Sequence, residues 1–167
     1  MEWDLTTKGK VLSRTDDSAL FTDPNPYVAD GNHPGSSPFD NLYPWKDMTI
    51  VQRDGNSLVK IPKFWVKVEK TAEKLSFKIA DKPIPGFIVS PAHRDRGDGE
   101  KDFVYIGRYH SDDNYKSRSG KGPISYITRA TARVNTHNLG SEYWQLDISM
   151  WLTIWFLYLV EFANWDS

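Results

Sequence analysis

Apolar and polar residues alternate along two consecutive segments near the middle of the chain. In residues 57–70, apolar side chains such as Val66 and Val68 have lysines between them, which is the pattern of a strand with one buried face. Residues 75–80 repeat the alternation. We therefore predict that 58–68 and 75–80 form adjacent antiparallel strands, with Pro62 marking a bulge or an edge near the start of the first.

The C-terminal part of the chain has the patterns of two helices. Thr128 is a good N-cap for a short helix that reaches about residue 138, and Gly140 follows as a stop signal. Residues 148–165 form the longest apolar stretch, and apolar side chains cover nearly the whole helical circumference. This predicts a helix that is buried on most sides. The stretch is short for a bilayer span and contains an acid, which favours a buried helix over insertion in a membrane.

Glu161 is the acid within this apolar stretch. Because an unpaired buried carboxylate is costly, we expect Glu161 to be ion-paired or hydrogen-bonded. Arg129 and Arg133, on the preceding helix, are the predicted partners. Trp151 and Trp155 are assigned a structural role in the packing of the long helix.

The rest of the chain predicts short strands and loops. Residues 1–20 look weakly structured apart from a β-like run at 10–13, and residues 22–45 contain seven prolines and glycines, which favours an irregular loop. The remaining signals are a turn at Asp54-Gly55, an extended run at 83–91, a strand at 103–109 and polar loops at 93–102 and 110–123. We expect an N-terminal arm and loop region over 1–42 and one α+β domain over 43–167.

The composition limits the function classes. The chain has 21 basic and 22 acidic side chains and a net charge of −1, so no overall field favours nucleic acid or an anionic membrane. It has no cysteine, which excludes disulfides, thiolate metal ligands and cysteine nucleophiles. The absence of cysteine fits folding in a reducing bacterial cytoplasm.

No motif in the sequence points to catalysis or to a metal site. The four histidines (His33, His93, His110 and His137) lack the spacing of zinc ligands. The acids of 95–102 and Asp112-Asp113-Asn114 could hold calcium, although solvated loops have the same composition. Arg96-Gly97-Asp98 matches an integrin-binding tripeptide that recurs by chance, and 119–122 lacks the Walker pattern. We expect no enzymatic activity, no cofactor and no resident metal.

Three ordered groups of segments resemble a known family. The first comprises residues 43–48 (YPWKDM) and 58–67 (LVKIPKFWVK), the second 86–92 (GFIVSPA) and 105–109 (YIGRY), and the third 128–133 (TRATAR), 143–148 (YWQLDI) and 157–164 (LYLVEFAN). Their order and spacing resemble bacteriophage tail and receptor-binding proteins with a C-type-lectin-like fold, related in architecture to formylglycine-generating enzymes.

The resemblance implies a fold and departs from the family in two ways. It implies two helices packed on a small twisted antiparallel sheet, with loops on one face that bind a host-surface partner. Members of the family continue with further strands beyond the segment that matches 157–164, so we expect either a fragment or completion of the sheet by another chain. The enzymes of this architecture hold copper through cysteines, which this chain lacks.

Two function hypotheses follow, and both place the protein in a virion. The first is a receptor-binding or adhesion module that recognises a bacterial surface glycan or protein through aromatic and polar loops. Its candidate ligand-binding residues are Tyr115, Arg118, Tyr126, His137, Tyr143 and Trp144. The second is a structural virion subunit of a fibre, baseplate or head decoration that binds only other phage proteins.

The expected assembly follows from the C-terminal helix. If no further strands cover this helix, a face with Trp151, Trp155 and Trp165 would be exposed, and such patches mark protein–protein contacts. We therefore expect a homo-oligomer, with a trimer favoured, or completion by another chain.

Overall fold

The computed structural model describes residues 1–6, 12–22 and 36–165. Its elements, in chain order, are β1 (Glu2–Asp4), β2 (Leu12–Ser13), η1 (Asp16–Leu20), η2 (Trp45–Asp47), β3 (Thr49–Arg53), β4 (Asn56–Pro62), β5 (Trp65–Lys70), β6 (Lys74–Ala80), β7 (Ile88–Val89), η3 (Pro91–His93), β8 (Phe103–Gly107), α1 (Arg129–His137) and α2 (Ile148–Phe162). Most of the loop predicted over 22–45, and the first two residues of the run predicted at 10–13, lie outside the described residues.

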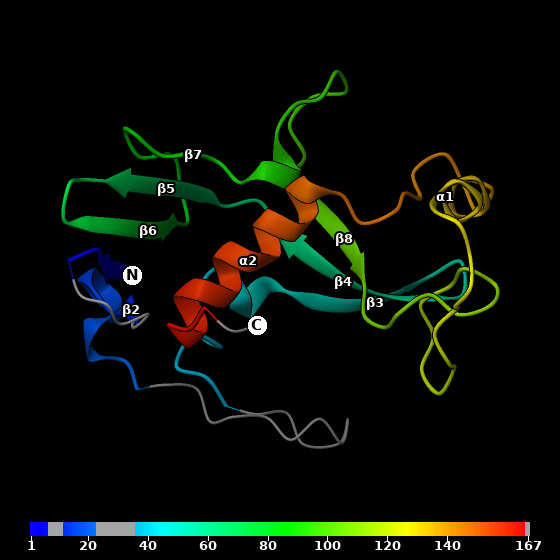
Figure 1. Cartoon of the computed structure of the whole chain (residues 1–167), viewed down its shortest axis with the longest axis horizontal. Helices are drawn as coiled ribbons and strands as arrows, with labels where there is room; N and C mark the ends of the chain where they lie inside the picture. The colour runs from blue at the N-terminus through cyan, green and yellow to red at the C-terminus, as the bar shows by residue number, and fades with distance from the viewer. Residues whose placement is uncertain (7–11, 23–35, 166–167) are drawn as a thin grey trace.

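The strands form two antiparallel sheets, and the protein has a mixed α+β fold. One sheet has five strands in the order β2-β1-β6-β5-β7, and the other has three in the order β3-β4-β8. Figure 1 shows α2 lying across both sheets, while α1 stands apart at one end of the molecule. The predicted turn joins β3 to β4, where Asp54 and Gly55 both have positive φ, as a two-residue hairpin turn requires.

The predicted pairing of 58–68 with 75–80 is correct only for its second half. Trp65–Lys70 pairs with β6 in the expected antiparallel orientation, but Asn56–Pro62 belongs to the other sheet and pairs with β3 and β8. The chain changes sheets after the Pro62–Phe103 pair and one further hydrogen bond, which the Lys63 N–H donates to the Asp102 carbonyl oxygen at 2.8 Å. Phe64, directly after this point, is fully buried in the core. The buried positions Ile61, Phe64 and Val66 thus serve one core from two strands, with a step of three residues where the chain changes sheets.

A single hydrophobic core lies between α2 and the sheets. It is formed by Met1, Leu12, Phe39, Ile61, Phe64, Val66, Phe77, Ala92, Val104, Phe156, Leu157, Leu159 and Val160. Residues before position 43 therefore contribute to the same core as the rest of the domain. Instead of forming a weakly structured arm, β1 pairs with the edge of β6, and a boundary at residue 42 does not divide the core.

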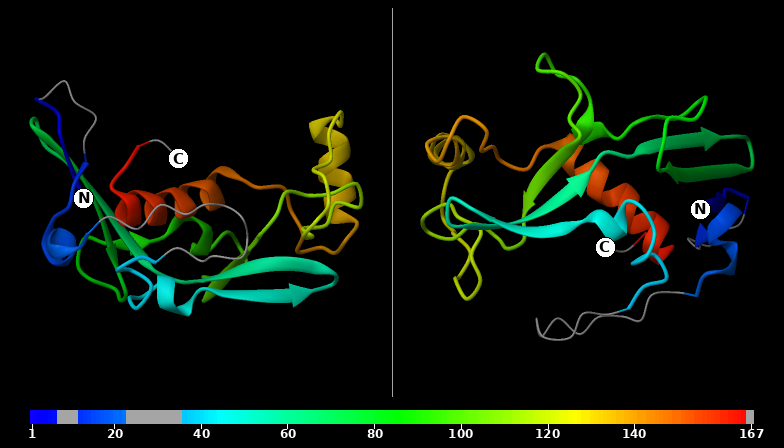
Figure 2. Two further views of the ribbon diagram at one scale, coloured as in Figure 1. Left: turned by 90° about the horizontal axis from the view of Figure 1, so that it is seen from below. Right: turned by 180° about the vertical axis from the view of Figure 1, so that it is seen from behind.

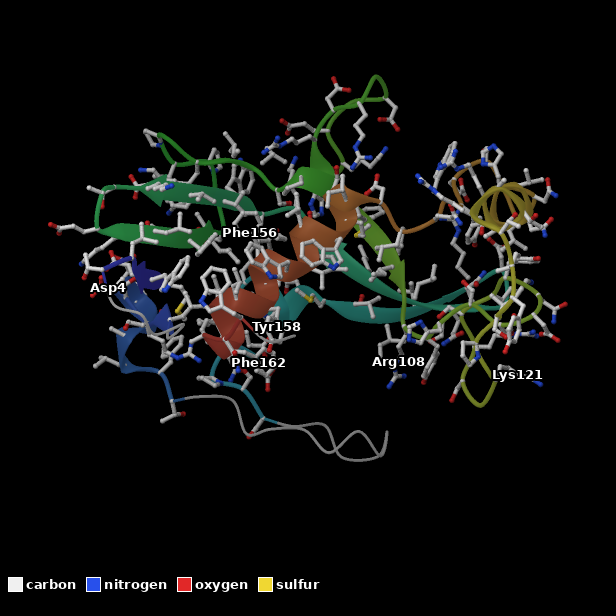
Figure 3. The ribbon with its side chains drawn as sticks, viewed as in Figure 1. Asp4, Arg108, Lys121, Phe156, Tyr158 and Phe162 are labelled. Atoms are coloured by element: carbon white, nitrogen blue, oxygen red, sulfur yellow. The ribbon has the colours of Figure 1, made fainter. Side chains whose placement is uncertain are left out.

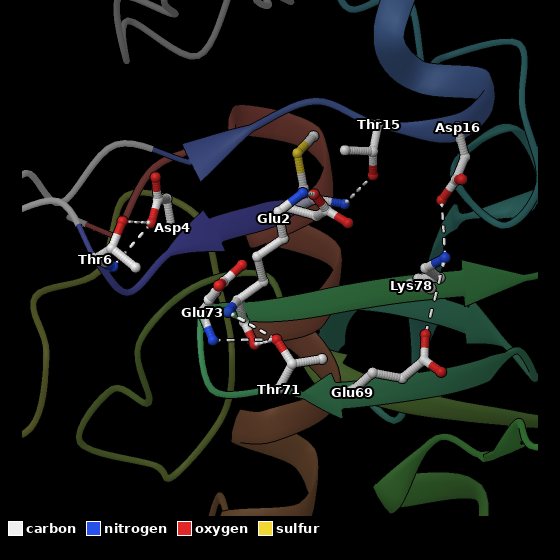
Figure 4. Close-up of polar contacts among 11 residues, drawn as sticks. Glu2, Asp4, Thr6, Thr15, Asp16, Glu69, Thr71, Glu73 and Lys78 are labelled. Carbon is white, nitrogen blue, oxygen red and sulfur yellow. Dashed lines mark hydrogen bonds and ion pairs between the residues drawn. The ribbon is translucent and has the colours of Figure 1, made fainter.

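Polar contacts fix the N-terminal strand to this edge (Figure 4). Lys74 pairs with Glu2, and Lys78 lies between Asp16 and Glu69 at 3.3 and 3.9 Å. These pairs are exposed and each stabilises the fold only slightly. The attachment of β1 rests mainly on the apolar side chains beneath it and on its ladder with β6.

The long helix begins and ends near the predicted residues but is not buried on all sides. Asp147 caps its N-terminus by accepting a hydrogen bond from the Met150 N–H, and the helix ends at Ala163 with left-handed φ. Ile148 and Trp151 are exposed on one side, Trp151 to 45%. Trp155 and Trp165 are partly buried against Trp3 and Phe77, so these two tryptophans do not form the open face expected from the sequence.

The predicted partners of Glu161 are wrong. Arg129 and Arg133 lie on α1, which buries none of its residues and does not pack on the sheet. Glu161 is half-buried, and its burial raises its pKa, while a hydrogen bond to Ser37 opposes that shift. The indole of Trp45 also opposes the shift, although its Nε1 makes no hydrogen bond of normal geometry. Sequence spacing cannot reveal these partners because they come from a loop more than 100 residues away.

Arg14 is the cation that reaches the end of α2. Its guanidinium donates to the carbonyl oxygens of Val160 and Glu161 at 3.1 and 2.7 Å. The last carbonyls of a helix lack intrahelical partners and carry partial negative charge, so a cation is favourable there. This contact ties the N-terminal segment to the C-terminal helix.

Candidate functional site

All six candidate binding residues lie in one continuous region, residues 108–146, which we call the distal lobe. It comprises the loops after β8, helix α1 and the connection to α2, and it lies at the opposite end of the molecule from β1 and β2 (Figures 1 and 2). The lobe contributes no residue to the hydrophobic core. Its buried residues are Asp112 and Ser117. The lobe is therefore held by polar contacts.

Asp112 organises the first loop of the lobe. Its carboxylate is 1% exposed and accepts hydrogen bonds from the backbone N–H groups of Asn114 and Lys116 at 2.9 and 3.1 Å, and from Arg118 Nε. These donors, Arg118 first, hold the pKa of Asp112 below its usual value. The carboxylate stays ionised at neutral pH and fixes the direction of the Arg118 side chain.

Ser117 joins this loop to the three-stranded sheet. Its N–H donates to Asn56 Oδ1 at 2.9 Å, and its hydroxyl donates to the carbonyl oxygen of Ser57 at 2.8 Å. Gly107 favours this contact, because a Cβ there would lie 3.1 Å from the Ser117 Cβ, which is a tight approach. The root of the lobe is thus a close backbone approach between the 110–118 loop and β4.

Helix α1 is tied to the loops by side chains at its flanks. Its N-cap Thr128 accepts a hydrogen bond from the Thr131 N–H at 3.2 Å. Asn135 donates to the Tyr115 hydroxyl at 2.6 Å, so the helix and the first loop are in contact. Of the predicted ligand-binding residues, Tyr115 is therefore partly engaged in structure.

Tyr143 fixes the other side of the lobe to the β3–β4 turn. Its hydroxyl donates to Asp54 Oδ2 at 2.8 Å. Burial, and then the contact with Asp54, raises the pKa of Tyr143 above 10, so the phenol keeps the proton that it donates. Arg53 and Glu142 form an ion pair beside it. Tyr143 is thus positioned as a structural contact as well as a candidate binding residue.

Two other candidate aromatic residues are presented to solvent. Tyr126 is fully exposed, and Trp144 is 65% exposed. The Trp144 ring lies against the imidazole of His137, with centroids 4.6 Å apart. Exposed rigid rings are large contact surfaces that lose little conformational entropy on binding.

The backbone is strained at two of the candidate tyrosines. Tyr115 and Tyr126 have φ values of 61° and 55°, in the left-handed region that bulky residues rarely adopt. Such conformations cost about 1–3 kcal/mol each and concentrate at functional sites. Tyr115 lies in the turn around buried Asp112, whereas Tyr126 is fully exposed, so Tyr126 is the strained residue that points to a role in binding.

Two open polar hollows flank Arg118. The outer hollow, about 590 Å³, is lined by Asp113, Asn114, Arg118, Lys121, Gly122, Pro123, Ile124 and Ser125. The inner hollow, about 420 Å³, is lined by Gln52, Gly55, Ser57, Arg108, Tyr109, Ser117, Arg118 and Ser119. Arg118 is thus the wall that both share. The sequence gives no reason to select Arg108 or Lys121 individually. The net positive charge of the segment 108–146 is the sequence signal that could have indicated them.

The other sequence candidates are engaged within the protein. His93 is a core residue and not a loop histidine: it is fully buried, and its ring nitrogens contact Ser90 Oγ at 2.5 Å and the Ile61 carbonyl oxygen at 3.1 Å. In the integrin-like tripeptide, Arg96 pairs with Asp147 and Asp98 pairs with Lys101. His33 lies outside the described residues.

The described residues contain no group of three or more His, Cys, Asp or Glu side chains placed to hold a metal ion. Asp95, a calcium candidate, accepts hydrogen bonds from the N–H groups of Gly97 and Gly99 in its own loop. Asp112 is committed to Arg118, as described above. Across the parts of the chain that the structure describes, no helix is long and apolar enough to cross a membrane.

Comparison with known proteins found no matching family model, no matching curated protein and no matching solved structure. The functional argument therefore rests on the geometry of the distal lobe.

Proposed function

We propose that this protein is a non-catalytic binding module of a bacteriophage virion that recognises a bacterial surface glycan or protein through its distal lobe. The observation that carries the proposal is that the lobe containing Tyr115, Arg118, Tyr126, His137, Tyr143 and Trp144 exposes Tyr126 fully and Trp144 to 65%. The resemblance to phage receptor-binding proteins of the C-type-lectin-like kind supplies the class of partner.

The physical character of the lobe supports this role. A binding region built from loops on a rigid scaffold can vary without disturbing the core. Here the loops are fixed by polar contacts around Asp112 and Ser117, while Tyr126 and Trp144 face solvent. Aromatic rings beside open polar hollows suit a partner with both apolar faces and hydroxyl groups, such as a sugar.

A structural virion subunit is the second candidate function, and one observation favours it. Near the N-terminus of α2, Ile148 is 68% exposed and Trp151 is 45% exposed. Apolar residues exposed side by side are typical of contacts between subunits. We propose that this face joins copies of the chain, with a trimer favoured, or another phage protein.

Two tryptophan variants distinguish the receptor-binding function from the structural one. The purified chain is labelled and its binding to a panel of Gram-negative and Gram-positive cells is measured for wild type, Trp144→Ala and Trp151→Ala. Recognition through the lobe predicts that Trp144→Ala loses binding by about tenfold or more, the range of an aromatic contact residue, while Trp151→Ala binds normally. Absence of binding to any cell, with Trp151→Ala abolishing self-association, would favour the structural subunit.

A further inference from the structure

The distal lobe carries a charge that differs from that of the rest of the molecule. Residues 108–146 contain six basic and three acidic side chains, a net charge of +3. The whole chain has a net charge of −1, so the residues outside the lobe together carry −4. The net charge of the whole chain is thus close to zero because a basic lobe and an acidic remainder of the molecule nearly cancel.

Each acid of the lobe lies near an arginine, although Asp113 is 86% exposed and shares Arg118 with Asp112. Asp112 pairs with Arg118, and the Asp113 carboxylate lies 4.0 Å from the same guanidinium. Glu142 pairs with Arg53, which lies outside the lobe. Asp113, which lines the outer hollow, is the one acid of the lobe without a close ion pair to a described residue, so the cations of the lobe outnumber the acids near them.

Five cations of the lobe make no ion pair in the described part of the chain: Lys116 donates to the Asp54 carbonyl oxygen, and the other four are Arg108, Lys121, Arg129 and Arg133. All four are exposed. Arg108 stacks over the Tyr109 ring at 5.3 Å and lines the inner hollow, and Lys121 lines the outer hollow. Figure 3 shows both side chains on the lobe, away from Phe156, Tyr158 and Phe162 on α2. Each hollow thus has one cation that makes no ion pair with a described residue, with Arg118 between them, and the outer hollow also has the carboxylate of Asp113.

We infer that the ligand of the distal lobe is an acidic polysaccharide whose anionic groups lie against Arg108 and Lys121. This inference rests on the proposed function and narrows its partner class. Anionic groups in the two hollows would pair with free cations, and sugar rings would pack on exposed aromatic residues such as Tyr126, which follows the segment that lines the outer hollow. The anion can be a carboxylate, as in a uronic acid polymer, or a phosphodiester, as in a teichoic acid.

The test uses the full chain and four polymers: polygalacturonate, a glycerol-phosphate teichoic acid, neutral dextran and single-stranded poly(dT). Binding is measured by biolayer interferometry at low and at high salt. We expect one of the two acidic glycans to bind, with weaker binding at high salt because exposed charges are screened. The acidic glycan that binds identifies the anion. Arg108→Gln and Lys121→Gln should each weaken binding about tenfold, as expected when a charged contact is lost.

Lys82→Gln is the matched control, because Lys82 is exposed, lies outside the lobe and loses the same charge. It should bind as wild type does, and thermal melts should show that all three variants fold. The inference is overturned if neither acidic glycan binds at low salt, if dextran binds as well, if poly(dT) binds more tightly, or if Lys82→Gln weakens binding equally. Salt-independent binding to cells that Trp144→Ala abolishes would keep the proposed function while refuting the acidic ligand.

Discussion

The α2 side of the molecule and the distal lobe are stabilised by different interactions. Around α2, thirteen buried apolar residues form one core, and aromatic rings from Trp3 to Trp165 pack edge to face. In the lobe, the buried groups are the carboxylate of Asp112 and the side chain of Ser117. The core fixes the fold, whereas the lobe uses hydrogen bonds to hold exposed side chains in place. Stability and recognition are thus assigned to separate ends of one chain.

The largest expected effect is the removal of a core side chain. Phe64 is fully buried where the chain passes between the sheets, so Phe64→Ala should lower the free energy of unfolding by about 3–5 kcal/mol. Trp144→Ala, in the lobe, should change it by less than about 0.5 kcal/mol. Urea unfolding followed by fluorescence measures both. Equal losses would show that the lobe is part of the same packed core.

The core should also respond to pH through His93. Burial lowers the pKa of His93 below 6.5, so the ring is neutral in the folded protein when it would be protonated in the unfolded chain. Its contribution to stability is complete above about pH 6.5 and is lost as the pH falls towards the lower folded pKa, by at most about 1.4 kcal/mol per pH unit.

The measurement compares wild type, His93→Gln and the exposed-site control His137→Gln between pH 7.5 and 5. The slope of unfolding free energy against pH should be smaller in His93→Gln than in the other two proteins. A slope that is the same in all three would show that His93 is not a buried neutral histidine.

A smaller and local effect is expected at Asp112. Asp112→Asn keeps the size of the side chain but removes the charge that Arg118 faces, so the loop 112–118 should open more often. Hydrogen exchange of its amides should accelerate about tenfold, with α2 unchanged. Asp113→Asn, at an exposed neighbour, is the control. Acceleration in α2 would contradict the separation of the two regions.

The smallest effect on stability is expected at Tyr126. This residue is fully exposed and has left-handed φ. Tyr126→Gly relieves the strain and should leave the melting temperature unchanged or slightly raised, while it weakens ligand binding. A lower melting temperature would mean that the ring packs on another part of the protein.

The sequence predicts those elements whose signals are local. The caps Thr128 and Asp147, the turn at Asp54 and Gly55, and the pairing of 65–70 with 75–80 all depend on neighbouring residues. The single predicted strand over 58–68 overlooks a change of phase at Pro62, where the buried apolar positions Ile61 and Phe64 are three residues apart and not two. Once one core is shared by two sheets, alternation alone cannot assign a strand to either.

The features that the sequence did not predict depend on contacts between residues far apart in the chain. The sequence identifies Glu161 as needing a partner, but Ser37 comes from a distant loop. Apolar residues on every side of α2 predict that the whole helix is buried. The other elements do not cover all of its apolar surface, and Ile148 and Trp151 stay exposed. The candidate residues of the lobe could be chosen from the sequence because they are aromatic or polar residues of predicted loops. The two hollows could not be predicted, because residues from β3, β4 and the loops after β8 line them only once the chain is folded.

Hydrogen exchange with and without ligand tests the central claim directly, because it needs no substitution. The full chain is compared free and in the presence of the bacterial surface polymer that binds it. We predict slower exchange in 108–126 on binding and no change in 148–162. Protection confined to 148–162, with none in the distal lobe, would contradict the account and assign recognition to α2.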